Sequence, residues 1–287
     1  MQKNKTEHNK VKKAICYEER GVSRQSFWWL TLIAAALVIA GNFADILYEP
    51  LKLSDTSYFT MKLLSFASTT LIAFLVTERA WQSHSKVKDL IVLAVLAVIS
   101  EPLYDLGTAN KFFDISRHGI MVNVLLCYAY AVIYQHDFST WFKKHYTNEN
   151  KVTYKMLALS TKTIPLVLFG FLSWQLKAEY SYYLLLITML FSFSRKRKHE
   201  YIWQFVSVFI LMASMYNGTP MYDTVFLPLI PIYIEQYRKQ HSQYLVKVDK
   251  LSFIDTVLDN YTVHNVLMIS YPMCMAAFVI LRLIISS

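Results

Sequence analysis

The sequence predicts an all-α fold, a polytopic integral membrane bundle of about nine transmembrane helices with a cytoplasmic N-terminus. Of the 287 residues, 55% are hydrophobic and only 6 are Gly and 7 Pro, which is too apolar and too poor in turn residues for an ordinary soluble domain. Apolar runs that can cross about 30 Å of hydrocarbon recur from residue 27 onward, and only helices or closed barrels satisfy their backbone there. Barrel-type alternation is absent, so we expect helices.

Two domains follow from this pattern. Residues 1–26 are polar and of mixed charge and are expected to form a cytoplasmic tail or a short surface helix, whereas 27–287 form the transmembrane domain. The first apolar stretch lacks a clear small-residue cleavage site, so it is interpreted as a retained span. The expected spans are 27–48, 58–78, 89–105, 119–136, 155–174, 180–194, 201–217, 222–237 and 264–285.

Positive charge fixes the expected topology. The segments assigned to the cytoplasm hold 22 of the 29 Lys and Arg, in 1–26, 79–88, 143–155, 195–198 and 238–250. The outer segments hold four: Lys52, Lys111, Arg117 and Lys177. This is the positive-inside distribution of a membrane protein, so the net charge of +9 does not indicate a nucleic-acid partner.

Two further features of the chain concern the cytoplasmic side and the cysteines. The longest cytoplasmic loop, 238–263, contains an amphipathic stretch at 244–258 that either lies on the membrane surface or simply connects two spans. Cys16, Cys127 and Cys274 fall in the tail and in two spans, where an extracellular disulfide framework cannot form.

Ionisable residues within or beside the spans are the first candidates for chemistry, because hydrocarbon penalises charge. Asp45 lies near the outer end of the first span, either as a site residue or in interfacial water. Glu101 and Asp105 are four residues apart, so a helix that continues through Pro102 places both carboxylates on one face. Their repulsion could then hold one proton for acid or base catalysis. If Pro102 ends the helix, both lie in water.

His118 is the only histidine assigned to the outer half of the protein, and it is either a proton-transfer group or a residue that starts a helix. Asp114 and Asp223 fall on the same side, and the alternative role of Asp223 is to cap a span. With Asp45, Glu101 and Asp105 they form an acidic outer cluster. The sequence shows no zinc, haem or nucleotide-loop signature.

The inner side offers one basic motif, Arg195-Lys196-Arg197-Lys198. Four adjacent cations could bind anionic lipid or the phosphates of a coenzyme. The positive-inside rule alone also produces such a loop without any ligand.

Several stretches together resemble the TraX family, whose members include the conjugal pilin acetylase. They are Phe74-Leu75-Val76-Thr77-Glu78, Ser85-Lys86-Val87-Lys88, Val98 to Leu106 with the core Ser100-Glu101-Pro102-Leu103-Tyr104-Asp105, Lys111 to Ser116, and Ile269-Ser270-Tyr271-Pro272. The resemblance implies a membrane acetyltransferase of the bacterial plasma membrane. It would move an acetyl group from cytoplasmic acetyl-CoA to an amine of an exported peptide or pilin-like protein, with Glu78, Glu101 and Asp105 as the matching acids.

Three histidine positions of the family pattern differ here. The Asp-His pair of the first span is Ala44-Asp45, the Ser-His of the outer loop is Ser116-Arg117 with His118 one residue later, and Cys274 stands near the closing Tyr-Pro. The alternative hypothesis is therefore a catalytically inactive accessory or immunity protein that binds an exported peptide through its acidic outer surface. A proton-coupled transporter is a third hypothesis, although the sequence shows no inverted repeat.

Overall fold

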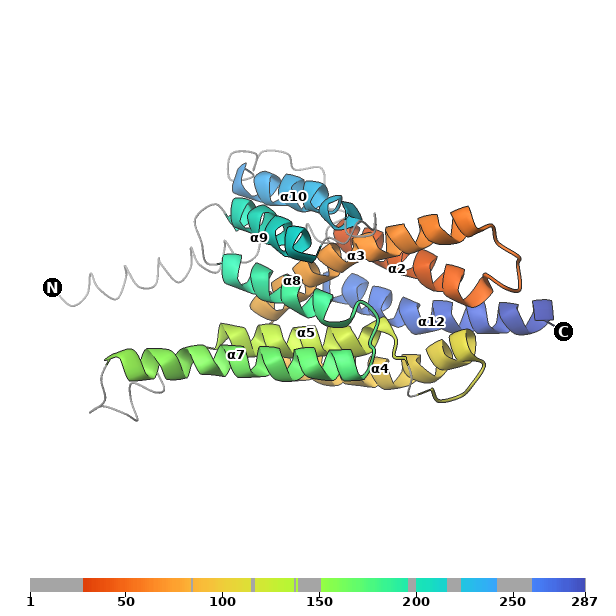
Figure 1. The fold of residues 1–287 in the computed structure, drawn as a ribbon, viewed down its shortest axis with the longest axis horizontal. Coiled ribbons are helices and arrows are strands. Elements are labelled where there is room, and N and C mark those ends of the chain that lie inside the picture. The colour runs from red at the N-terminus through yellow and green to blue at the C-terminus, as the bar shows by residue number, and fades with distance from the viewer. Residues whose placement is uncertain are drawn as a thin grey trace.

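The computed structural model describes residues 28–83, 85–114, 117–136, 138, 151–195, 200–215, 223–241 and 260–286, and nearly all of them are helical (Figure 1). The helices are α2 (Trp28–Leu47), α3 (Asp55–Gln82), α4 (Lys86–Ala109), α5 (Ile120–Gln135), α7 (Lys151–Gln175), α8 (Ser181–Ser194), α9 (Glu200–Met215), the short 3-10 helix η1 (Asp223–Phe226), α10 (Leu229–His241) and α12 (Asn260–Ser286). The all-α fold is thus confirmed. The predicted tail at 1–26 and the amphipathic stretch at 244–258 lie outside the described residues.

The described helices coincide with the apolar segments of the sequence. Four of them, α2, α3, α4 and α7, are long and apolar enough to cross a membrane, and the others contain shorter apolar stretches. One predicted span is interrupted: 222–237 is divided between η1 and α10 by a turn at Leu227 and Pro228. Pro228 has no N–H to continue η1, so the helix restarts after it.

The central helix of the bundle is α3, which packs against α2, α5, α8 and η1. Small side chains permit this: Ser65, Ala67, Ser68 and Ala73 are all buried. At the closest point Gly41 of α2 faces Ser65, and a Cβ on Gly41 would collide with the Ser65 side chain. Close approach through small residues is the usual way that helices associate in membranes.

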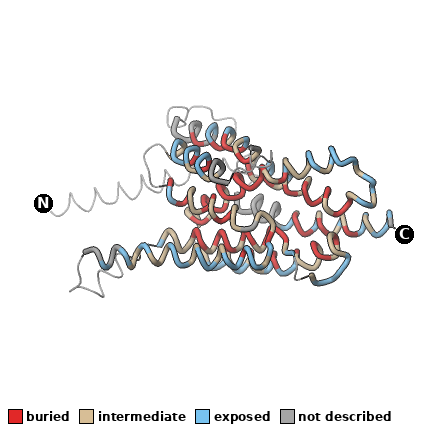
Figure 2. Tube along the Cα trace, viewed as in Figure 1, coloured by how far each residue is buried: buried red, intermediate tan, exposed pale blue. Residues whose placement is uncertain are grey.

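Many positions along α7 are exposed (Figure 2), and large apolar side chains occupy many of them. Only 6% of the most apolar window of α7 is buried. The exposed side chains on this helix include Leu159, Val167, Leu168, Phe171 and Trp174. An apolar surface of this extent suits contact with lipid and would be a liability in water.

Two connections meet at one end of the bundle. The segment after α4 and the segment between α7 and α8 form a parallel bridge between His118 and Ala178, and the Glu179 N–H donates to the His118 carbonyl at 2.9 Å. In Figure 1 the connection from α7 to α8 lies nearer the middle of the bundle than the connection from α2 to α3. This recessed end carries most of the candidate site residues.

Candidate functional site

Glu101 and His118 form the centre of the site. The Glu101 Oε2 atom lies 3.2 Å from His118 Nδ1, and Glu101 Oε1 accepts the Gly119 N–H at 2.9 Å. The two side chains are only 14% and 20% exposed. An ionised Glu101 can only accept hydrogen bonds, so in that state Nδ1 of a neutral imidazole carries the proton and Nε2 has a free lone pair. His118 Nε2 is buried and has no hydrogen-bond partner within the described residues.

The local sequence explains why these groups meet. α4 continues through Pro102 to Ala109, which puts Glu101 and Asp105 on the same helix one turn apart. Asn110 then ends the helix in the left-handed conformation, with φ 56°, and turns the chain back. A Cβ on Gly119 would lie 3.4 Å from Glu101 Oε1, so the glycine gives the carboxylate close access to the backbone.

Asp105 lies within electrostatic range of Glu101, and one of its oxygens is held by the backbone. Its Oδ2 accepts the Asp114 N–H at 2.8 Å, which fastens the returning loop to α4. Its Oδ1 is buried and unpartnered among the described residues. One oxygen of Asp105 therefore holds the loop by a hydrogen bond, and the other can accept a hydrogen bond from a ligand.

Asp45 pairs with a cation of the neighbouring helix. Its Oδ2 lies 2.7 Å from Lys62 Nζ, and its Oδ1 accepts the Tyr58 hydroxyl at 3.2 Å. The Asp45 side chain is 13% exposed. Asp45 is thus an ion-paired residue at the mouth of the bundle, and not a carboxylate free in interfacial water.

Glu179 is a residue that the sequence did not single out. Both carboxylate oxygens are buried, and neither has a well-formed hydrogen bond within the described residues. Burial raises the pKa of the Glu179 carboxyl above its ordinary value, while the nearby Lys62 charge opposes that rise. Glu179 is one acid in a short polar loop, and nothing in its spacing indicates that the loop folds inward.

Two buried tyrosines lie near both Glu101 and Glu179. Tyr104 of α4 and Tyr271 of α12 are both at least 90% buried and lie within electrostatic range of both Glu101 and Glu179. Tyr271 belongs to the Ile269–Pro272 stretch that resembles the TraX family. The site therefore draws on α4, α12 and the two connections that meet at the His118–Ala178 bridge.

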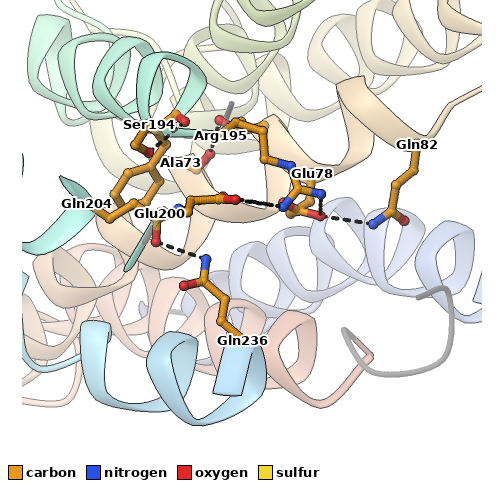
Figure 3. A network of polar contacts seen from close by, with 10 residues as sticks. Ala73, Glu78, Gln82, Ser194, Arg195, Glu200, Gln204 and Gln236 are labelled. Carbon is orange, nitrogen blue, oxygen red and sulfur yellow. Dashed lines mark hydrogen bonds and ion pairs between the residues drawn. The ribbon is translucent and has the colours of Figure 1, made fainter. Parts of the chain in front are cut away.

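The described part of the basic motif is neutralised within the protein (Figure 3). Arg195 lies 2.8 Å from Glu78 Oε1 and 3.2 Å from Glu200 Oε2. Gln204 and Gln236 extend the network from Glu200 toward α10 through hydrogen bonds of 3.0 Å each. An arginine that already serves two carboxylates is a poor ligand for coenzyme phosphates. Lys196, Arg197 and Lys198 lie outside the described residues, so their predicted role stays a prediction.

Glu78 is consequently separate from the outer cluster, although the family resemblance groups it with Glu101 and Asp105. It pairs with Arg195, and its Oε2 also accepts the Gln82 side-chain amide at 2.9 Å. Asp223 begins η1, as a capping role would require, but its side chain lies outside the description. Within the described residues, no group of three or more His, Cys, Asp or Glu is arranged to hold a metal ion.

Comparisons of the chain with protein-family models, with curated proteins and with solved structures give no match. The geometry of the site must therefore support any functional assignment by itself.

Proposed function

We propose that the chain is a multi-pass membrane acyltransferase that moves an acyl group, acetyl in the simplest case, from a coenzyme A thioester to an amine of an exported peptide or pilin-like protein. It would cross a bacterial plasma membrane nine times with its N-terminus in the cytoplasm. This topology places the Glu101–His118 pair toward the outer side, so the proposal requires that the bundle carry the acyl thioester across to the pair. The TraX resemblance of the sequence suggested this activity, and the Glu101–His118 pair is the observation that supports it.

The pair has the geometry of a general base. The Glu101 carboxylate holds the imidazole by Nδ1, which leaves Nε2 to accept a proton in a buried site. Once the acceptor is a neutral amine, His118 Nε2 takes one of its two protons as the nitrogen bonds to the acyl carbon, and the other proton stays on the amide nitrogen. His118 then returns that proton to the sulfur as the carbon–sulfur bond breaks. Asp45, ion-paired to Lys62, is proposed to help position the acceptor, and Asp105 holds the loop that carries His118.

The experiment is acyl transfer by the purified full chain in lipid vesicles, followed by intact-mass spectrometry of an amine-bearing peptide. His118→Gln should reduce transfer by a factor of about 10² to 10⁴, the usual contribution of a general base. Glu101→Gln should also reduce it, because the imidazole loses the carboxylate that orients it. His136→Gln is the matched control, since His136 is exposed at the end of α5. Equal transfer by the wild type and His118→Gln would contradict the assignment.

A second candidate function is peptide binding by the same acidic residues, without catalysis. The unpartnered oxygen of Asp105 leaves negative charge that a basic exported peptide could compensate, as in an accessory or immunity protein. In that case the wild type would co-purify with the peptide and transfer nothing. The complex should then be lost in the Glu101→Gln, Asp105→Asn double variant.

A further inference from the structure

A cavity of about 120 Å³ lies among the helices of the bundle, and neither Glu101 nor His118 lines it. Its walls come from α2, α3, α4, α5 and α12, and most of the side chains that line it are apolar. They include Ala34, Val38, Ile72, Val76, Leu93 and Val124. The proposed transfer chemistry does not use this cavity.

One end of the cavity approaches the site through Ile120 and Tyr271. Ile120 lines it and directly follows Gly119, whose N–H donates to Glu101 at 2.9 Å. Tyr128, two turns further along α5, also lines it, so the cavity follows about 12 Å of that helix. A space that extends along a helix for this distance is a slot, and it suits a chain more than a compact group.

The far end of the slot offers no site for an anion. Arg79 is located there, but its guanidinium donates to both oxygens of Asp89, at 2.8 and 3.2 Å. The Tyr128 hydroxyl also donates to Asp89, at 2.9 Å. A charged headgroup would find the arginine already occupied, so the far end suits the apolar tip of a ligand.

The near end has a polar group in need of a partner. Tyr271 lines the cavity and is 7% exposed, and its buried hydroxyl has no hydrogen-bond partner within the described residues. Leaving a buried hydroxyl unpaired costs free energy, which a ligand with an acceptor oxygen would recover. A carbonyl oxygen next to an apolar chain fits this combination.

We propose that the slot holds the alkyl chain of the transferred acyl group, with its carbonyl end toward Tyr271 and the Glu101–His118 pair. This inference rests on the proposed function and specifies its donor. A dry apolar cavity of about 150 Å³ accommodates benzene, so a cavity of this size suits a chain of about six carbons. An acetyl group would leave most of it empty. The preferred donor is therefore a medium-chain acyl thioester.

The test compares acyl-CoA donors of two, four, six, eight and twelve carbons with the full chain in lipid vesicles. We expect kcat/KM to rise about fourfold with each methylene up to about six carbons, the equivalent of about 0.8 kcal/mol per methylene, and to fall beyond eight. Ala35→Leu places three more carbons in the slot and should lower the preference for hexanoyl over acetyl on the order of fiftyfold. Ala36→Leu is the control, because Ala36 is exposed on the next position of α2.

Either of two results would overturn the inference: acetyl as the best donor, or an Ala35→Leu variant with the wild-type chain-length preference. If the wild type transfers no acyl group, the proposed function fails, and the slot is then tested by binding alone. The hexyl thioether of coenzyme A, which cannot transfer a group, should raise the unfolding temperature of the wild type more than the methyl thioether does. Ala35→Leu should abolish that difference. Equal stabilisation by both thioethers in the wild type would show that the slot does not select a chain.

Discussion

The Arg195 network gives a prediction that does not depend on any assumed activity. Arg195 joins Glu78 of α3 to Glu200 of α9, and the Glu78 side chain is only 3% exposed. Replacing Arg195 by Gln removes the guanidinium from both carboxylates at once. Breaking a buried ion pair in this way destabilises a protein by about 3–5 kcal/mol, so we expect that loss for Arg195→Gln.

The two carboxylates should differ in their effect. Glu78→Gln removes the more buried partner but leaves Arg195 with Glu200, and we expect a loss of about 1.5–3 kcal/mol, the range for a hydrogen bond to a charged group. Glu200→Gln removes a longer and more exposed contact and should cost at most about 1 kcal/mol. The order of the three variants follows from their distances and exposure.

The assay is thermal or denaturant unfolding of the purified protein in detergent, completed as a double-mutant cycle with Glu78→Gln, Arg195→Gln. Because the two single changes break the same pair, the double variant should be less destabilised than the sum of the single variants by at least about 1 kcal/mol. Strict additivity would refute the assignment of a direct ion pair. If Arg195→Gln were as stable as the wild type, the network would not contribute to stability and the reasoning would be refuted.

Two further predictions concern the outer half of the bundle. The raised pKa of Glu179 means that the folded state keeps a proton that the unfolded state has released, so unfolding free energy should fall as pH rises above about 4.3 and through the raised pKa. The unfolding temperature is measured by circular dichroism for the wild type and for Glu179→Gln at several pH values. The unfolding temperature of the variant minus that of the wild type should increase as pH rises. A difference that stays constant or decreases would contradict this prediction. Gly41→Ala should destabilise the protein by about 1–3 kcal/mol through its collision with Ser65, and Ser65→Gly should offset much of that loss; no rescue in the double variant would place the cost elsewhere.

The sequence predicts the helices well because membrane insertion imposes a strong local signal. Apolar length marks each helix without any knowledge of its neighbours, and the i to i+4 spacing of Glu101 and Asp105 predicts their shared face once α4 continues through Pro102. The apolar pattern does not predict the turn at Leu227 and Pro228, which divides one apolar run between η1 and α10.

The site is less predictable because its contacts join distant parts of the chain. His118 meets Glu101 only when the loop after α4 folds back, and Glu179 is buried only because its loop bridges to His118. Charge counting predicts an inner-side location for Arg195, but it cannot show that Glu78, 117 positions away, neutralises it. The predicted side of the membrane for a basic residue depends only on the local sequence, whereas its ion-pair partner depends on how the helices pack.

The dispersal of the site along the chain has a consequence for biosynthesis. Glu101, His118 and Glu179 leave the ribosome well before Tyr271, which lies within electrostatic range of Glu101 and Glu179. At about 5–20 residues per second, roughly 5 to 20 s separate the synthesis of Glu179 from that of Tyr271. During that interval the acidic residues must be inserted without α12 beside them. The site is therefore complete only once α12 has been synthesised and has packed against the other helices.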